Sequence, residues 1–221
     1  LNQADFIEET IYSVLSQKGD FELEMIVLDG ESTDGTVEIL KKYSDKIKWI
    51  SEKDEGQADA VNKGISMSTG EIIGWLNSDD IYRQNALKIV AEHFRNNSEC
   101  EWLFGKCKII DKYGEETRSL KTKYKNYQLL RYSYKKLLIE NFISQPAVFF
   151  KHSFFEKAGK LNIDYKYAMD YDLWLRFGKI SDPCIVNTYL AAFRKHPGSK
   201  SENSYKKQFK EEYEIAKSYT E

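Results

Sequence analysis

The amino-acid sequence predicts an α/β fold with a mainly parallel central sheet flanked by helices. Short apolar runs alternate with segments of helical periodicity, and short joints connect them. Two of the apolar runs end abruptly at polar clusters, one at Asp29 and one at residues 77–80. Ligands of such sheets bind beyond the carboxyl ends of the strands, so both clusters are candidate ligand sites. The length of 221 residues suits one compact domain.

The first half of the chain alternates regularly between helix and strand patterns. Apolar residues recur every three or four positions near the start, which predicts an amphipathic helix over residues 4–17. The run 25–28 is short, apolar and partly β-branched, as a buried parallel strand is. The same reasoning predicts helices beginning at residue 33 and covering 57–68 and 83–97, and strands over 47–51 and 71–76.

The second half has a mixed pattern. Residues 102–111 and 116–121 flank Lys112, Tyr113 and Gly114, as the two strands of a hairpin flank their turn. Further strands are predicted over 147–150 and 185–193, and a further helix over 170–177.

The composition excludes several classes of protein. With 33 basic and 35 acidic residues, the formal net charge of -2 gives no case for a nucleic-acid partner. No apolar stretch approaches the ~20 residues of a membrane-spanning helix, which predicts a cytoplasmic protein, soluble or peripheral at the inner face of the membrane. The three cysteines, Cys100, Cys107 and Cys184, form no CxxC pair, so we expect reduced thiols.

Four motifs follow one another between residues 27 and 80. They are VLDGESTDGT at 27–36, DEG at 54–56, DAVNKG at 59–64 and GEIIGWLNSDD at 70–80. Three later segments are QPAVF at 145–149, DYDLWLR at 170–176 and RKHPGS at 194–199. In order and spacing these segments resemble glycosyltransferase family two. Each motif alone is weakly specific, but the resemblance covers nearly the whole chain.

The resemblance implies the GT-A nucleotide-diphospho-sugar transferase fold, Rossmann-like, as a single domain over residues 1–221. Residues 1–98 form the nucleotide-sugar-binding half, whose first strand we expect to be missing from this chain, and residues 99–221 form a mixed acceptor-binding half. It also implies an inverting hexosyltransferase that moves a sugar from a UDP- or dTDP-sugar to a growing polysaccharide or lipid-linked glycan, in cell-envelope biosynthesis.

Asp29 is implied by the resemblance to accept a hydrogen bond from the pyrimidine ring of the donor. A carboxylate offers only acceptors and therefore suits an imide N–H. The alternative is that Asp29 and Ser32 organise the turn into the next helix. Glu31 stands where the family usually has Gly, which puts the geometry of this loop in question. The donor site is predicted to include Asp29, Glu31, Asp54, Asp59, Lys63, Asn77, Ser78 and Arg194.

Residues 77–80 match the DxD element of the family, with Asn77 in place of the first acid. An acidic cluster that faces an anionic diphosphate predicts a cation between them, which we expect to be Mn²⁺ or Mg²⁺. Asp79 is the predicted main metal ligand, and Asn77 is predicted to contact the ribose or a bound water. His196 is a candidate further ligand, because imidazole is acceptable to Mn²⁺. The alternatives are a polar turn after a buried strand and a histidine in a surface loop.

Asp170 matches the place of the catalytic base in the inverting members of the family. A general base must reach the attacking hydroxyl and be ionised near working pH, which an aspartate can be. The alternative is that Asp170 caps the following helix. Asp172 is the reserve candidate.

Residues 121–136 carry six Lys or Arg residues and four Tyr residues, and no acid. Basic residues interleaved with amphipathic aromatics favour contact with an anionic membrane or a lipid-pyrophosphate acceptor. The alternative is a solvated helix face with tyrosines in the core.

Two other classes of function remain open from the sequence. A nucleotidyltransferase uses a similar sheet and acid pair, although the Gly-rich phosphate loop typical of that class is not visible. A nucleotide-sugar-binding module without transferase activity would follow from the lack of the first strand.

Overall fold

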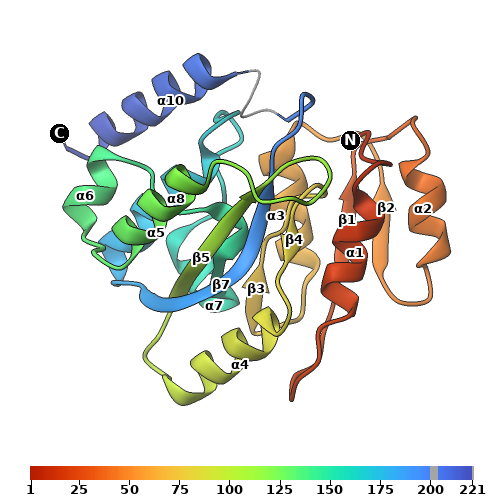
Figure 1. The fold of residues 1–221 in the computed structure, drawn as a ribbon, viewed down its shortest axis with the longest axis horizontal. Helices are drawn as coiled ribbons and strands as arrows, with labels where there is room; N and C mark the ends of the chain where they lie inside the picture. Colours follow the sequence, from red (N-terminus) through yellow and green to blue (C-terminus); the bar gives the residue numbers. More distant parts are fainter. Residues whose placement is uncertain (200–203, 221) are drawn as a thin grey trace.

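The computed structural model describes residues 1–199 and 204–220. Its strands form two separate sheets with helices packed around them, which confirms the predicted α/β class (Figure 1). None of the helices in these two stretches has both the length and the apolar character that crossing a bilayer requires.

The first sheet lies near the N-terminus and contains two parallel strands (Figure 1). All the elements that the sequence predicts for this stretch are present. Asp29 pairs with Ser51, so both residues stand at the carboxyl end of the sheet. The apolar faces of the two helices of this region, α1 and α2, meet around Ile11 and Leu40 in a small core of their own. The elements are α1 (Ile7–Leu15), β1 (Ile26–Asp29), α2 (Thr36–Lys42) and β2 (Lys48–Ser51).

The second sheet has five strands in the order β3-β6-β5-β7-β4. Only β5 and β7 run parallel within it, and the other neighbours are antiparallel, so the sheet is mixed rather than mainly parallel. The strands are β3 (Ile72–Gly74), β4 (Ile81–Tyr82), β5 (Trp102–Ile110), β6 (Val148–Lys151) and β7 (Cys184–Arg194).

The remaining helices pack against these sheets. Helix α3 contacts β1, α5 contacts β5, and α4 contacts β7. They are α3 (Gln57–Met67), α4 (Ala86–Asn96), α5 (Ser119–Leu129), α6 (Tyr134–Ile139), the 3-10 turn η1 (Gln145–Ala147), α7 (His152–Ala158), α8 (Met169–Ile180) and α10 (Tyr205–Ser218).

The hairpin predicted after residue 102 is wrong in its second strand. In the structure, the segment 116–121 forms no strand, and its described pairing with β5 is one bridge between Glu116 and Ile110. Helix α5 begins at Ser119 because Thr122, Asn126 and Leu129, which recur at helical spacing, are buried on one side of it. The exposed basic residues between them masked this pattern.

The prediction of three reduced thiols is also wrong. Cys100 and Cys184 form a disulfide, with their Cα atoms 6.1 Å apart, whereas Cys107 is a free, buried thiol. The two bonded cysteines are 84 residues apart in the sequence. They meet because the parallel pairing of β5 with β7 places Leu103 opposite Cys184.

The main core lies between the five-stranded sheet and α8. The indoles of Trp102 and Trp174 are stacked with ring centroids 6.1 Å apart, and Phe177 packs on both. All three side chains are fully buried. This packing fixes α8, which carries Asp170, against β5.

A large cleft separates the two sheets. Its volume is about 1880 Å³, and residues of both β1 and β3 line it. Among the described strands, β1 pairs only with β2 and β3 pairs only with β6, so each has an unpaired edge that faces the other. The cleft exceeds the usual ~300–1,000 Å³ of a ligand pocket because it includes the space between these two strand edges.

Glu211 of α10 holds the start of α8. Its carboxylate accepts hydrogen bonds from the backbone N–H groups of Tyr167 at 2.8 Å, Ala168 at 2.7 Å and Lys166 at 3.1 Å. Helix N-termini carry unsatisfied N–H groups and a partial positive charge, so a carboxylate is favourable here. Glu211 thus holds the segment that leads into α8, whereas the Tyr171 N–H in the first turn of the helix donates to Asp170.

We expect Glu211→Ala to lower the free energy of unfolding by about 1.5–3 kcal/mol, because three backbone donors lose a charged acceptor. Urea unfolding followed by circular dichroism measures this loss. The matched control is Glu214→Ala on the exposed side of the same helix, which should change stability by less than about 0.5 kcal/mol. Equal effects of the two substitutions would show that Glu211 does not hold the helix start.

Candidate active site

Asp29 ends β1, and its buried carboxylate organises the turn that follows. The Ser32 N–H and the Ser51 hydroxyl donate to Oδ2 at 2.9 and 2.7 Å, and the Ser32 hydroxyl donates to Oδ1. Burial alone would raise the pKa of Asp29, but these hydrogen bonds outweigh it and hold the pKa below its ordinary value. A carboxylate offers about four acceptor positions, so one remains for the N–H of a donor base.

The loop after Asp29 has an unusual backbone. Glu31 adopts the left-handed conformation with φ 61°, which costs a residue with a β-carbon about 1–2 kcal/mol relative to Gly. This conformation explains why the family usually has Gly at this position. The Glu31 side chain is exposed. At Gly30, a β-carbon would lie 2.8 Å from Oδ2 of Asp54, so a larger residue here would displace the Asp54 carboxylate.

Three predicted donor-site residues line one small hollow beside β1. Asp29, Asp54 and Lys63 surround a space of about 10 Å³. Lys63 forms surface ion pairs with Glu52 at 3.0 Å and with Asp59 at 3.5 Å. Asp59 thus lies beside the hollow as a partner of Lys63, and exposed pairs of this kind stabilise a fold very little.

The side chain of Asn77 is held by four hydrogen bonds. Its oxygen accepts from the Gln57 amide at 2.7 Å and from the Trp75 indole at 3.1 Å. Its nitrogen donates to Gln145 at 3.0 Å and to Asp80 at 3.4 Å. A primary amide has two donors and two acceptor positions, so Asn77 has no capacity left for a ribose hydroxyl. Its role in this structure is to position the loop.

Asp79 and His196 meet beside the cleft. Oδ2 of Asp79 lies 3.1 Å from Nε2 of His196, and the two side chains are 17% and 9% exposed. The Phe6 ring packs against the imidazole with centroids 4.5 Å apart. Neighbouring ligands of a six-coordinate ion are ~3 Å apart when each is ~2.1 Å from the metal. The distance is that of a hydrogen bond between the two groups, and it is also compatible with two ligands of one ion.

Asp79 also lines the cleft, together with Asp54, Asn77, Ser78 and Asp170. Five of the predicted site residues thus line this one cleft, and His196 is connected to them through Asp79.

Arg194 is buried and lies behind the acidic loop. Its guanidinium donates to the carbonyl oxygens of Asp79, Asp111 and Lys112 at 2.8, 3.2 and 3.3 Å, and to the Glu9 carboxylate at 2.5 Å. The side chain is only 1% exposed. These contacts leave it no access to a diphosphate, so its role is structural, in contrast to the donor contact that the sequence suggests.

Asp80 is fully buried beside Arg194. Its Oδ1 accepts from the Arg194 backbone N–H at 2.8 Å. Burial, together with the charge of Asp79, raises the pKa of Asp80 well above its usual range. Asp80 therefore braces the loop from behind, and Asp79 alone of the two acids lines the cleft.

Asp170 lies in the first turn of α8 and lines the same cleft as Asp79. Burial raises the pKa of Asp170 to about 6, and the charge of Glu212 adds to this effect. The Tyr171 N–H donates to its Oδ1 at 2.9 Å and opposes the rise. A carboxylate with a pKa in this range is suited to general base catalysis near neutral pH.

Asp172, the reserve candidate for the base, is fully engaged in structural contacts. Arg176 donates to its Oδ2 at 2.9 and 3.0 Å, and the Tyr219 hydroxyl donates to its Oδ1 at 2.8 Å. It belongs to the packing of α8 against the C-terminal helix.

Two charged residues beside Asp170 were not among the predicted site residues. Lys125 of α5 and Glu212 of α10 both line the cleft. Burial and the neighbouring Lys121 lower the pKa of Lys125, while Asp170 and Glu212 act in the opposite direction. Lys121 and Lys125 stand four positions apart, so a correct helix prediction for this segment would have placed both on one face.

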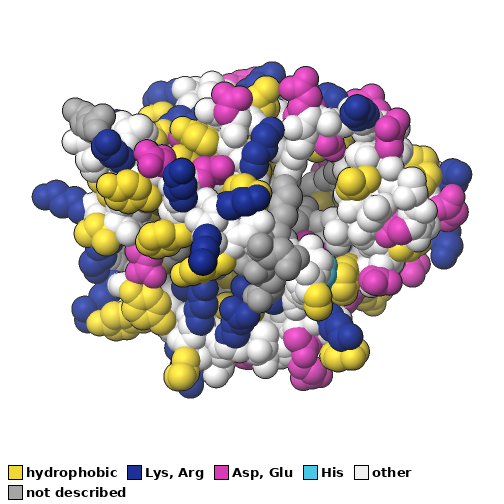
Figure 2. Space-filling view, turned by 90° about the horizontal axis from the view of Figure 1, so that it is seen from above, with side chains coloured by type: hydrophobic (Ala, Val, Ile, Leu, Met, Phe, Trp, Pro, Cys, Tyr) yellow, Lys and Arg dark blue, Asp and Glu magenta, His cyan; other side chains and the backbone are white. Residues whose placement is uncertain are grey.

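The basic segment 121–136 divides between surface and core. Tyr124 and Tyr127 are about half exposed, whereas Tyr132 and Tyr134 pack against the main core. Figure 2 shows Lys, Arg and hydrophobic side chains interleaved over the part of the face at the left. Leu120 and Ile139, at the ends of α5 and α6, are 80% and 85% exposed. The tyrosines of the segment thus divide between an exposed pair and a pair in the core, and membrane contact stays a prediction.

Comparison with known proteins identifies relatives of the chain. Residues 1–157 match the sequence model of the family "Glycosyl transferase family 2". An uncharacterized glycosyltransferase of Methanocaldococcus jannaschii is 29% identical over 191 residues, which cover 83% of this chain and 61% of the relative. One of Rickettsia typhi is 30% identical over 203 residues, covering 88% and 61%. The chain thus spans about three-fifths of the length of these relatives.

Solved structures show the same fold. The S. aureus protein TarS 1-349 in complex with UDP superposes with a TM-score of 0.70 at 18% identity, covering 97% of this chain and 61% of that one. The mannosyltransferase PcManGT from Pyrobaculum calidifontis, in complex with GDP-Man and Mn²⁺, has a TM-score of 0.64 at 18% identity, covering 92% and 56%. Since the family match extends over more than half of the sequence, the protein belongs to glycosyltransferase family 2, and its fold is the GT-A fold that the sequence predicted.

Proposed function

We propose that this protein transfers a sugar from a UDP- or dTDP-sugar to a growing polysaccharide or lipid-linked glycan, with inversion at the anomeric carbon. The observation that carries the proposal is the placement of Asp79, paired with His196, and of Asp170 around one cleft. One group is suited to hold a cation and the other to accept a proton. The structural neighbours that carry UDP or GDP-Man with Mn²⁺ support a nucleotide-sugar donor and a divalent cation for this fold.

The cation is assigned to Asp79 and His196. Among the described residues this site offers two protein ligands rather than three, so diphosphate oxygens and water would complete the coordination, as is usual for Mg²⁺ and acceptable for Mn²⁺. The Gly198 N–H donates to Nδ1 of His196 at 3.3 Å, so Nε2 carries the proton of the neutral ring, and a cation there requires the other tautomer. When bound, the ion supplies positive charge that stabilises the departing diphosphate.

The donor base is assigned to the surface beside the carboxyl end of β1, because the hollow itself, at about 10 Å³, has room for no more than a water molecule. Asp29 has one acceptor position left for the ring N–H, and Asp54 and Lys63 line the same hollow. Lys195 lines the cleft next to His196 and provides the positive charge toward the diphosphate that the buried Arg194 does not.

Asp170 is assigned as the general base. The acceptor hydroxyl gives its proton to the Asp170 carboxylate while its oxygen bonds to the anomeric carbon and the bond from that carbon to the diphosphate breaks. The raised pKa favours proton transfer to Asp170. Lys125 and Glu212 stand beside it with opposite charges and set its protonation by opposing effects.

The acceptor is proposed to lie at a membrane surface. Exposed apolar residues of α5 and α6 stand among Lys123, Arg131 and Lys135 on one face. Basic residues near an anionic bilayer contribute about 1 kcal/mol each, and exposed aromatics favour its interface. Peripheral contact of this face would present the cleft to a lipid-linked glycan.

We expect Asp79→Ala to abolish Mn²⁺-dependent binding of UDP, because the cation loses its carboxylate ligand. Isothermal titration calorimetry with and without Mn²⁺ measures this. Asp45→Ala removes one exposed acid elsewhere and should bind UDP as the unmodified protein does. Undiminished Mn²⁺-dependent binding by Asp79→Ala would refute the metal assignment.

We expect Asp170→Asn to reduce transfer by at least ~100-fold while donor affinity stays unchanged. The base acts in its ionised form, so the rate of the unmodified enzyme should rise as the pH increases through about 6, and Asp170→Asn should lack this rise. Asp172→Asn is the matched control, which should affect stability but keep the pH dependence. An unchanged pH profile in Asp170→Asn would remove this residue from the mechanism.

We expect replacement of Lys123, Arg131 and Lys135 by Gln to release the protein from anionic liposomes, since three charges near the surface are lost. Co-sedimentation at low salt measures the bound fraction. Gln at Lys41, Lys42 and Lys46, which are exposed on and beside α2 at the other side of the molecule, removes the same charge and should leave binding intact. Equal loss in both variants would indicate a general charge effect and no specific face.

A further inference from the structure

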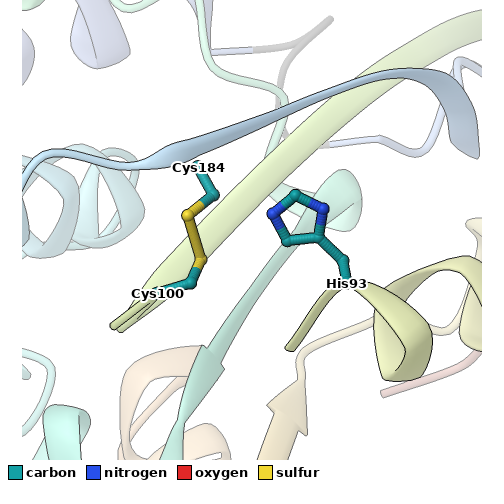
Figure 3. A group of neighbouring side chains, drawn as sticks. All are labelled: His93, Cys100 and Cys184. Carbon is teal, nitrogen blue, oxygen red and sulfur yellow. A yellow bond between two sulfur atoms is a disulfide. The ribbon is translucent and has the colours of Figure 1, made fainter. Parts of the chain in front are cut away.

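A second group of metal-ligating side chains lies away from the cleft. His93 comes from α4, Cys100 precedes β5, and Cys184 is the first residue of β7 (Figure 3). Arg194, which lies behind the Asp79 loop, is the last residue of the same strand. At ~3.3 Å per residue the two ends of β7 are roughly 30 Å apart, so this cluster is independent of the proposed donor site.

The three side chains converge. Their ligand atoms, one ring nitrogen and two sulfurs, all lie within 4.8 Å of one another. The imidazole of His93 lies beside the disulfide (Figure 3). Neither ring nitrogen hydrogen-bonds to any group in the part of the chain that the structure describes. Half-buried imidazoles normally have a polar partner, so the position of His93 next to two sulfurs calls for an explanation.

The surroundings are those of a soft metal site. Cys100 belongs to the apolar cluster that includes Val90 and Phe94 of α4, and Cys184 packs against it. Cys100 is buried, whereas His93 and Cys184 are half-buried, so one side of the cluster is open to solvent. Two thiolates and an imidazole prefer Zn²⁺ over the hard cations Mg²⁺ and Ca²⁺.

We infer that His93, Cys100 and Cys184 bind one Zn²⁺ ion when the disulfide is reduced. Tetrahedral zinc with Zn–S distances near 2.3 Å and Zn–N distances near 2.0 Å separates its ligands by ~3.5–3.8 Å, which lies within the span of this cluster. Water on the open side would be the fourth ligand. The ion would join α4 to the starts of β5 and β7, which the disulfide otherwise links to each other.

The two states exchange by balanced steps. A dithiol reductant transfers two electrons and two protons to the Cys100–Cys184 bond, giving two thiols, and is itself oxidised to a disulfide. Zn²⁺ then displaces the two thiol protons and bonds to both sulfurs and to the neutral imidazole. Disulfide and zinc exclude each other, so the redox state of the surroundings selects between them.

The test uses the full chain with Asp79→Ala, so that the proposed cation site in the cleft does not contribute. Zn²⁺ is titrated into oxidised and phosphine-reduced protein in competition with a chromophoric chelator. We expect one tightly bound Zn²⁺ per reduced chain and none per oxidised chain. Co²⁺ in place of Zn²⁺ should give a thiolate-to-metal charge-transfer band in the reduced protein only.

Variants separate a metal site from incidental thiol binding. His93→Ala should weaken Zn²⁺ binding by more than about 10-fold, the lower limit seen even for groups that only support a ligand. Cys107→Ala, which removes the free thiol outside the cluster, should bind as the parent does. The inference is overturned if reduced protein binds Zn²⁺ no more tightly than oxidised protein, or if His93→Ala retains full affinity. Circular dichroism of each variant verifies its fold. For His93→Ala, the oxidised protein with its intact disulfide provides a second check that the substitution does not disturb folding.

Discussion

The buried contacts of Arg194 with the acidic loop are the constraint on which the rest of the site depends. One guanidinium joins the loop after β3, the turn after β5 and helix α1, through Asp79, Asp111 and Glu9. The N–H of the same residue binds the Asp80 carboxylate. Because a buried cation needs acceptors on every side, these segments cannot separate without leaving an uncompensated charge. His196 follows Arg194 by two positions, so the same anchor sets its distance from Asp79.

The proposed base depends on a different residue. In many helices an acid in the first turn is used to satisfy the free N–H groups. Here the role is shared: Glu211, from a helix some forty residues further along the chain, accepts from the Ala168 N–H just before the helix, and Asp170 accepts from the Tyr171 N–H within the first turn. That contact engages one carboxylate oxygen of Asp170, which lines the cleft with a raised pKa. The C-terminal helix thus supports the start of the helix that carries the proposed base, and its Glu212 lines the cleft beside Asp170.

Local patterns explain which parts were predictable. The alternation of strands and helices, and the polar clusters at strand ends, follow from periodicity alone, and the motifs place Asp79 and Asp170 at one cleft. Burial depends on contacts between distant segments and is not visible in a local pattern. The sequence-based prediction therefore placed Arg194 at the donor, although segments more than eighty residues away enclose this side chain. The same limit applies to Cys100 and Cys184, whose partnership is created by strand order. The missed helix α5 also hid Lys125, because its exposed lysines obscured the buried positions at 122, 126 and 129.

The left-handed backbone at Glu31 restricts the conformations open to the loop after Asp29. A glycine at this position would relieve the local strain, but it would also give the unfolded chain and the loop more conformations to choose from. With Glu31 the loop has fewer accessible conformations. The contacts of Ser32 and Ser51 with Asp29 hold it in a conformation that Glu31 itself disfavours. The protein therefore tolerates local backbone strain and has a preorganised loop. Entry of a nucleotide beside β1 would need less ordering of this segment than it would with a flexible turn.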